Sequence, residues 1–489
     1  MLVFAFILMV CAVRADYWEV RDMLIKKDRS HGIGSNLELS NLEKEANKIL
    51  MEYKYREIDA SFENPGNFSP ARHFFHSKPD IERSEIFKII QMLPKGASLH
   101  GHDTALVSDD FLFNLTYKED LYLCGGSVLK FLASDKDGCK SLQDLRNSDP
   151  DFNTWLRKQM TLIVDNPKEA YPDINAVWKR FSKIFALITP MITYKPVFEE
   201  YLYQVLQEFY NDNVSYVELR ATLGWIYDAK GKRYDPFEVV GLYKDIVDQF
   251  KSKNPGFFGA RVIYAPTRNV NNETMYNYMM NARKLKQLYP NFIAGFDLVG
   301  QEDLGKPLDE FICELQSISK EMKFFFHAGE TNWYGVSTDL NLFDAILLNT
   351  QRIGHGYALV KHPEALRAVK EKQIGIEISP ISNQVLMLVD DLRNHPANVL
   401  IAHGMPVVIC NDDPSFWGAR GLSYDWYMAF MGMSSRESDL RLLKQLAVNS
   451  FLYSSMDASE KLDSINKWEK LWNDFLYHLV AMYSNMLSD

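Results

Sequence analysis

Eight short apolar runs, spread over residues 97–413 and separated by helix-like segments, constrain the fold of this chain more than any other feature. Near-continuous apolar strands that alternate with amphipathic helices indicate parallel strands buried on both faces. Eight such units predict an α/β fold, a closed (β/α)8 TIM barrel, rather than an open doubly wound sheet. The expected strands lie within residues 97–102, 214–220, 258–266, 292–300, 323–330, 352–356, 374–383 and 407–413.

Two segments do not fit the barrel repeat. About 110 residues separate the first two expected strands, far more than one crossover helix needs, so residues 111–176 are predicted to be a subdomain inserted into a barrel that spans residues 93–489. Residues 16–92 are charged and have helical periodicity, with a capping-box pattern at Ser40 and Glu43. We expect a helical N-terminal region whose apolar stripes pack on the barrel or on a second copy of the chain.

The extreme N-terminus has the features of a secretory signal peptide at residues 1–15. Residues 2–13 are uncharged and apolar, too few to span a bilayer, and Val13 and Ala15 supply small residues at −3 and −1 of a cleavage point. The alternative is a buried N-terminal helix. No other window reaches 18 apolar residues, so we expect a secreted, extracellular protein without a membrane span. Its net charge of −10, with no long basic run, disfavours nucleic acid as a partner.

Secretion affects how the cysteines are interpreted. An oxidising compartment would let Cys124 pair with Cys139 across a short polar stretch, whereas Cys313 and Cys410 are expected to be buried free thiols. No CxxC motif is present, so a thiolate zinc cage is not expected. Three sequons that are candidate glycosylation sites fit the secretory route: Asn114, Asn213 and Asn272.

Polar residues at the ends of the expected strands point to a metal site. In a barrel the carboxyl ends of the strands share one rim, so residues distant in sequence converge there. His100 and His102 lie two apart on one strand and point to the same face. An isolated HxH is more often a pair of surface residues, but His327 and Asp412 follow two other apolar runs. Three imidazoles and one carboxylate would hold a divalent cation and leave room for water, whereas a structural zinc site favours four closed thiolate or imidazole ligands.

Three further residues near this rim are candidates for acid–base chemistry and substrate binding. Glu330, three residues after His327, would have a raised pKa near the metal and could deliver a proton; its alternative role is to orient His327. His355, between two glycines, is the candidate base that takes a proton from water at the metal. Asp413 would turn to the substrate while Asp412 ligates the metal; the alternative is a solvated pair in a loop.

Five motifs together resemble the adenosine deaminase superfamily of metallo-dependent hydrolases, and most closely the secreted adenosine deaminase growth factors. They are PKGASLHGHD, HAGE, RIGHG, SPISNQVL and NDDPSFWGARGLSYDW. The resemblance implies one Zn²⁺ per chain, held by His100, His102, His327 and Asp412. It also implies that Glu330 donates a proton to purine N1 and that His355 is the proton acceptor. Zinc cytidine deaminases use H-x-E and P-C-x-x-C ligands, and neither motif occurs here.

The same resemblance implies a set of substrate-binding residues. Asp413 would bind purine N7, the Gly300 backbone would contact N3, and Asp103 would hold a ribose hydroxyl. The stretch from Trp178 to Phe185 would wall the nucleoside. Thr267 stands where the family commonly has a ribose-binding His, so affinity or ribose preference is expected to differ.

The expected function is therefore that of a secreted zinc-dependent adenosine aminohydrolase, which hydrolyses adenosine to inosine and ammonia. We expect it to accept 2′-deoxyadenosine as well. We expect a homodimer formed through residues 16–92, and a cell-surface receptor or glycan as a partner of residues 111–176. One alternative is a deaminase that acts on AMP, which would need a cationic phosphate site. The other is a receptor-binding growth factor with incidental or no catalysis.

Overall fold

The computed structural model describes residues 17–134 and 136–483 of the chain, so the expected signal peptide at 1–15 lies outside the described residues. Eight parallel strands form two four-stranded sheets, and each strand overlaps one of the eight predicted apolar runs. In sheet order, the first contains β1 (Gly96–Ser98), β5 (Val214–Ala221), β8 (Gly259–Tyr264) and β9 (Ile293–Phe296). The second contains β10 (His327–Ala328), β11 (Arg352–His355), β12 (Gly375–Ile378) and β13 (Val407–Ile409).

Two isolated parallel bridges join these sheets into a ring. Phe296, at the end of β9, pairs with Phe324 just before β10, and Phe325 N donates to Phe296 O over 3.0 Å. At the other seam Gly101 pairs with Asp412, and His102 N donates to Asp412 O over 3.2 Å. The predicted (β/α)8 barrel is therefore confirmed, with its second seam at the residues predicted to bind metal.

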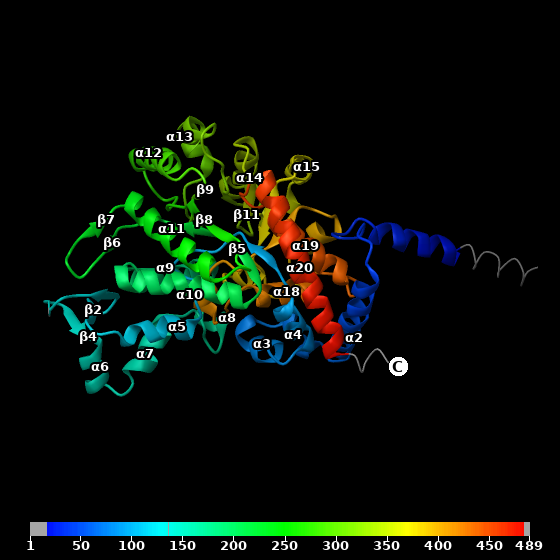
Figure 1. Cartoon of the computed structure of the whole chain (residues 1–489), viewed down its shortest axis with the longest axis horizontal. Helices are drawn as coiled ribbons and strands as arrows, with labels where there is room; N and C mark the ends of the chain where they lie inside the picture. The colour runs from blue at the N-terminus through cyan, green and yellow to red at the C-terminus, as the bar shows by residue number, and fades with distance from the viewer. Residues whose placement is uncertain (1–16, 135, 484–489) are drawn as a thin grey trace, which may run out of the picture.

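Helices surround this ring (Figure 1). Their inward apolar side chains are part of one buried core. The helix α11 (Pro236–Lys253) illustrates the local causes: Asp235 and Glu238 form a capping box, Pro236 supplies the first turn, and the buried side is apolar, with three valines, one isoleucine, one phenylalanine and one tyrosine. The others that lie between or after barrel strands are α10 (Lys195–Asn211), α12 (Asn272–Leu288), α13 (Ile312–Ile318), α14 (Ser337–Leu347), α15 (Pro363–Lys372), α16 (Pro380–Val385), α17 (Ala397–Ala402), α18 (Ser423–Gly432), α19 (Leu440–Leu452) and α20 (Ala458–Met482).

The region before the barrel contains α2 (Asn41–Glu63), α3 (Phe74–Ile81) and α4 (Glu85–Met92), preceded by a helix at 17–29. The expected capping box is present, with Ser40 N donating to Glu43 Oε2 over 2.8 Å and Glu43 N donating to Ser40 Oγ over 3.3 Å. The buried side of α2 contacts α20 of the same chain, and Trp472 Nε1 donates to Glu43 Oε1 over 2.9 Å. Of the two expected alternatives, α2 thus packs on the barrel's own helices.

The helix at 17–29 differs from α2 because its apolar side chains are exposed. It projects from the body of the molecule as the blue helix nearest the N-terminus (Figure 1). Its exposed apolar side chains are Tyr17, Trp18, Val20, Met23 and Leu24. Within the described residues, no helix has both the length and the apolar character that crossing a membrane requires.

Residues 111–176 contain small elements that are not part of the barrel repeat. The strands β2 (Leu121–Cys124), β3 (Val128–Phe131) and β4 (Cys139–Ser141) form an antiparallel sheet in the order β3-β2-β4. The same part of the chain contains α5 (Asp109–Asn114), α6 (Leu142–Ser148), α7 (Phe152–Gln159) and α8 (Pro167–Ala170), of which α6 contacts β2 and β4. The predicted disulfide is present: Cys124 and Cys139 are directly paired on β2 and β4 and bonded through sulfur.

The two remaining described cysteines differ from each other. Cys410, directly after β13, is buried as expected. The prediction was wrong for Cys313, which is exposed. Because α13 turns Leu315 and Ile318 inward, helical periodicity directs position 313 toward the opposite side.

Candidate active site

The four predicted metal ligands converge at the carboxyl end of the barrel. One nitrogen or oxygen of each of His100, His102, His327 and Asp412 lies within 4.8 Å of the corresponding atom of the others. Asp412 Oδ1 lies 3.2 Å from His100 Nε2 and 3.1 Å from His102 Nε2. The geometry comes from the barrel seam, where the segment after β1 runs beside the segment after β13.

The donor set of this cluster fits a divalent cation. His100 Nε2 and Asp412 Oδ1 are buried polar atoms without a hydrogen-bond partner, a costly arrangement that a bound cation would relieve. Three imidazole nitrogens and one carboxylate oxygen are ligands that zinc accepts, and such a set leaves a position for water.

Buried carboxylates fix the orientation of two of the imidazoles. His100 Nδ1 lies 2.8 Å from Glu377 Oε2, and His327 Nδ1 lies 2.6 Å from Asp297 Oδ2. Because each carboxylate accepts the Nδ1 hydrogen, Nε2 of each ring keeps its lone pair for the cation. Burial lowers the pKa of His327 to about 3, which favours the neutral, ligating form.

Two buried arginines hold these carboxylates. Arg220 Nε donates to Asp297 over 2.8 Å, and another nitrogen of Arg220 donates to Glu377 over 2.7 Å. Arg352 pairs with Glu377 and, over 2.7 Å, with Glu218. None of these five residues was identified from the sequence. Their signal was a charge inside an otherwise apolar strand, which is tolerated only when it is paired in the fold.

Glu330 lies in a tight, buried turn after β10. The backbone N–H groups of Gly329 and Glu330 donate to the carboxylate of Glu302 over 2.9 and 2.7 Å. Burial, followed by the nearby charges of Asp412 and Glu302, raises the pKa of Glu330 well above its ordinary value. The Glu330 carboxyl therefore keeps its proton to a higher pH than an exposed glutamate does, which suits it to deliver a proton. Glu302 was not identified from the sequence.

His355 ends β11 in a left-handed backbone conformation, with φ of 61°, and Gly356 follows with φ of 55°. Its Nε2 lies 3.5 Å from Glu330 Oε1 and 3.9 Å from Asp412 Oδ2. Burial holds the pKa of His355 well below its ordinary value. A non-glycine residue with positive φ is strained, and such strain is commonly retained at functional sites.

Asp413 and Gly300 border the same end of the barrel. Asp413 Oδ1 is buried without a hydrogen-bond partner, and burial, followed by the adjacent Asp412 charge, raises the pKa of Asp413 well above its ordinary value. A protonated carboxyl with one oxygen free of partners can donate to a ring nitrogen of a ligand. Gly300, after β9, has φ of 104°, and no other atom lies within 4 Å of where a Cβ would stand.

The remaining predicted substrate residues surround this rim. Asp103 accepts a hydrogen bond from Tyr243, and burial raises the pKa of Asp103 to about 6. Thr267, exposed after β8, pairs with Val299 in an isolated bridge. Trp178 and Phe185 are half-buried on α9 (Ile174–Ile192), and the Phe185 ring lies 4.8 Å from that of Phe416, three residues after Asp413.

The three predicted glycosylation residues all lie on the surface, at the end of α5, before β5 and at the start of α12. Their asparagines, Asn114, Asn213 and Asn272, are exposed. The Asn213 Nδ2 group also donates to Gln91 O over 2.8 Å.

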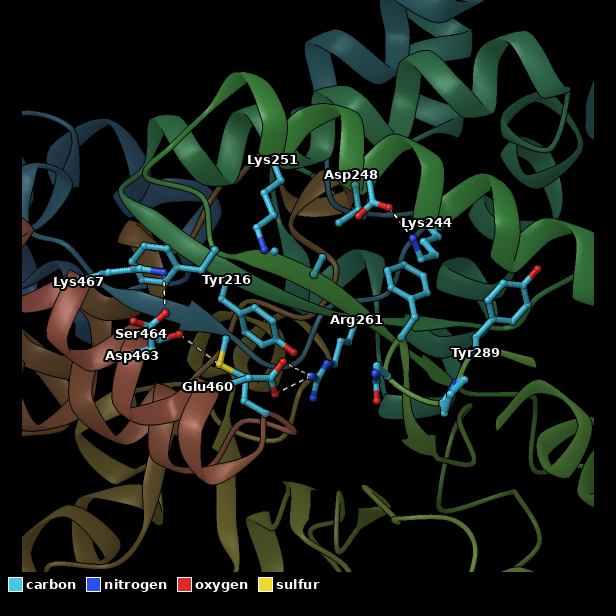
Figure 2. Close-up of a pocket in the computed structure, with 18 of the residues that line it drawn as sticks. Tyr216, Lys244, Asp248, Lys251, Arg261, Tyr289, Glu460, Asp463, Ser464 and Lys467 are labelled. Carbon is cyan, nitrogen blue, oxygen red and sulfur yellow. Dashed lines mark hydrogen bonds and ion pairs between the residues drawn. The ribbon is translucent and has the colours of Figure 1, made fainter. Parts of the chain in front are cut away.

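A separate cavity of about 480 Å³ opens at the amino ends of β5, β8 and β9 (Figure 2). Most charged side chains in its wall pair with each other: Arg261 with Glu460, Lys244 with Asp248, and Lys467 with Asp463. The chemistry of barrel enzymes occurs at the carboxyl ends of the strands, so this cavity is not the candidate active site.

Comparisons with known proteins agree with this geometry. Residues 157–470 match the family model described as "Adenosine deaminase", and residues 2–90 match "Adenosine/AMP deaminase N-terminal". The chain is 44% identical to the adenosine deaminase of Lutzomyia longipalpis over 473 residues, which cover 94% of this chain and 93% of that protein. Its identity to adenosine deaminase 2 of Homo sapiens is 40% over 475 residues, with coverage of 94% and 93%.

Solved structures with low sequence identity share the fold. An amidohydrolase from Burkholderia ambifaria with bound Zn has a TM-score of 0.58 at 17% identity, and the match covers 81% of this chain and 95% of that chain. The Arabidopsis N6-mAMP deaminase has a TM-score of 0.56 at 18% identity, with coverage of 78% and 99%. At these identities the likeness concerns the barrel fold alone.

Proposed function

The chain belongs to the adenosine deaminase family and has the fold of a metal-dependent hydrolase, and on that premise we propose that it is a secreted, zinc-dependent adenosine aminohydrolase. Adenosine would give inosine and ammonia, and 2′-deoxyadenosine would be accepted as well. The observation that carries the proposal is the convergence of His100, His102, His327 and Asp412 with a buried acid, Glu330, at one end of the barrel.

Each residue of the site has a role in this reaction that follows from its protonation and position. Bound zinc would supply a Lewis acid that lowers the pKa of water to about 7. Glu330, protonated, would donate to purine N1 as the ring loses aromaticity, and Asp413, also protonated, would donate to N7. The Gly300 backbone would contact purine N3, and the Asp103 carboxylate would accept a hydrogen bond from a ribose hydroxyl. Trp178 and Phe185 would exclude water from the bound nucleoside.

A nucleoside is favoured over a nucleoside monophosphate as substrate. Arg268 directly follows Thr267 at the rim, but its guanidinium is buried and donates to the carbonyls of Leu298 and His327, each over 3.0 Å. Both bonds come from Nη2, and the whole side chain is buried, so Arg268 does not present an accessible phosphate site. With Thr267 in place of a ribose-binding His, the ribose would be held chiefly through Asp103.

The proposal extends to location and partners. The Cys124–Cys139 disulfide and the three exposed sequons support passage through the secretory route. The exposed apolar side chains of the helix at 17–29 support a homodimer formed through residues 16–92. The subdomain at 111–176 is the candidate surface for a cell-surface receptor or glycan, and growth-factor activity would depend on it.

The decisive experiment combines metal analysis with a panel of nucleosides. Adenosine should be converted with stoichiometric release of ammonia, AMP should be left unchanged, and purified protein should carry one zinc per chain. A zinc-loaded protein that leaves adenosine and 2′-deoxyadenosine intact would refute the enzyme proposal. A receptor-binding growth factor without catalysis would keep its effect on cells in the Glu330→Gln variant, whereas an effect caused by removal of adenosine would be lost in that variant.

A further inference from the structure

Behind His355, on the side away from the metal ligands, a chain of three hydrogen bonds leads to a backbone amide. Asn383, in α16, lies between two imidazoles: its Nδ2 is 3.1 Å from His355 Nδ1, and its Oδ1 is 2.9 Å from His395 Nε2. The other ring nitrogen of His395, Nδ1, lies 3.0 Å from the backbone nitrogen of Ala397. All three side chains are buried, so water does not compete for these bonds.

The donor and acceptor roles in this series of hydrogen bonds are fixed at the backbone amide of Ala397. The backbone N–H of Ala397 can only donate, so Nδ1 of His395 must accept and cannot carry a hydrogen. A neutral imidazole has one N–H, and that N–H must therefore be at Nε2 of His395. Burial lowers the pKa of His395 to about 3, so the ring stays neutral at physiological pH.

The donor and acceptor roles at His395 determine those at Asn383 and, through Asn383, those at His355. Because His395 Nε2 donates, the group of Asn383 that faces it must be the carbonyl oxygen Oδ1. The amide Nδ2 of Asn383 then faces His355 and donates to Nδ1 of that ring. With Nδ1 accepting, the neutral His355 ring carries its hydrogen at Nε2, the nitrogen that faces Glu330 and Asp412.

We propose that Asn383 and His395 are positioning residues that hold His355 as the neutral Nε2–H ring, so that His355 donates a hydrogen bond to the attacking water and does not remove its proton. The inference rests on the proposed deaminase function and revises the base role expected for His355 from the sequence. In a His355 ring protonated at both nitrogens, the Nδ1–H would face the side-chain N–H of Asn383, and two donors facing each other are unfavourable. The N–H at Nε2 would orient a lone pair of the water oxygen. A bound cation would lower the pKa of that water to about 7, so its proton would be released to solvent and not to His355.

The direct test observes the His355 ring in the zinc-loaded protein and does not depend on turnover. Long-range ¹H–¹⁵N correlation spectra of protein labelled at histidine distinguish a protonated ring nitrogen from an unprotonated one. The His355 signals are assigned by their loss in His355→Gln. We expect an unprotonated Nδ1 and a protonated Nε2. A ring protonated at Nδ1 alone, or at both nitrogens, would overturn the proposal even in a fully active enzyme, whereas loss of adenosine turnover alone would count only against the proposed function.

A kinetic test uses side chains that can donate but cannot act as a base. The amide nitrogen of Gln can stand near the position of His Nε2, whereas Leu offers no polar group. Since losing one donor of this kind costs on the order of 10²-fold in kcat, we expect His355→Leu to lose about that factor and His355→Gln to recover at least about tenfold of it. Equal losses in the two variants, with zinc content and Tm unchanged, would favour the base role.

The positioning residues are tested through the tautomer that they impose. In Asn383→Asp both side-chain oxygens accept, so the His355 hydrogen should move to Nδ1; the ¹⁵N signature should reverse, and kcat should fall with little change in KM. The matched control is Asn449→Asp, the same change at another buried asparagine, which donates to Val407 O and has no contact with His355. Two results would contradict the proposal. One is a folded Asn383→Asp variant in which the His355 hydrogen stays at Nε2. The other is a variant in which that hydrogen moves to Nδ1 but kcat does not fall.

Discussion

His327 Nδ1 lies 2.6 Å from Oδ2 of Asp297, and the same carboxylate oxygen accepts from Arg220 Nε over 2.8 Å. One buried carboxylate thus connects a predicted metal ligand to a buried arginine. Burial opposes the charge of Asp297, but the Arg220 charge and the hydrogen bonds from His327 and Arg220 outweigh this effect and hold its pKa below the ordinary value. The ion pair beneath the site therefore determines which His327 nitrogen is available to the cation.

Replacing Asp297 with Asn should weaken metal binding more than it changes the fold. The amide would accept the His327 hydrogen less strongly and would leave Arg220 with reduced charge compensation. Loss of such an outer partner typically costs about 10–100-fold in metal affinity. Competition with a chelator measures the zinc dissociation constant directly, with exposed Asp309→Asn as the control. An unchanged dissociation constant would show that Asp297 does not tune the site.

Replacing Glu330 with Gln should remove catalysis while zinc remains bound. Gln keeps the size of the side chain but has no proton to transfer, and general acid catalysis is typically worth ~10²–10⁴-fold. We therefore expect kcat to fall by a factor in that range with stoichiometric zinc retained. Because the pKa of Glu330 is raised, the wild-type rate should fall on the alkaline side, as pH rises through that pKa and the proton is lost. A variant with near wild-type kcat would limit Glu330 to orienting its neighbours.

The parts of this protein that were predictable from sequence are those that local pattern specifies. Each barrel strand is a short apolar run, and His327 and Asp412 were identifiable because a polar residue follows such a run. The orienting groups were not identified, because Asp297 and Glu377 act through contacts 30 and 277 residues away, with His327 and His100. Only the register of the closed barrel brings these pairs together.

Sequence-based prediction also failed where burial depended on which side of a helix faces the core. Cys313 lies in a helix whose length was evident but whose buried side was not, and the residue is exposed. The tautomer of His355 depends on Asn383 and on His395, which lie 28 and 40 residues away in sequence. Asn383 contacts the His355 ring from α16, and His395 contacts Asn383 in turn. The side chain of His395 has no local pattern that would distinguish it from a core histidine.

Removing the disulfide should loosen the inserted subdomain without stopping catalysis. Cys124 and Cys139 are separated by 15 residues, and a cross-link that closes a loop of this length contributes about 3 kcal/mol. The Cys124→Ser/Cys139→Ser double variant should be cleaved faster by protease within 111–176 and keep the wild-type kcat for adenosine. Cys313→Ser, at an exposed free thiol, is the control. Unchanged protease resistance would mean that β2 and β4 hold together without the bond.

The docking of α2 on the barrel should depend on pH through Glu57. Its carboxylate accepts from the Ser84 hydroxyl over 2.6 Å and from the hydroxyl of Tyr427 on α18. Burial raises the pKa of Glu57, and the two hydrogen bonds oppose the shift only in part. A raised folded-state pKa means that the folded protein binds more protons than the unfolded chain between the ordinary pKa, 4.5, and the raised value.

Stability contributed at this position must therefore fall as pH rises through that window, by about 1.4 kcal/mol for each unit by which the pKa is raised. Glu57→Gln cannot ionise, so the Tm of the variant minus that of the wild type should increase from pH 4.5 to pH 7.5. Glu63→Gln, an exposed change in the same helix, should give a difference that stays flat. Because other titrating groups contribute equally to both proteins, the difference isolates Glu57. A difference that decreased with pH would mean that the Ser84 and Tyr427 hydroxyls stabilise the carboxylate more than burial destabilises it.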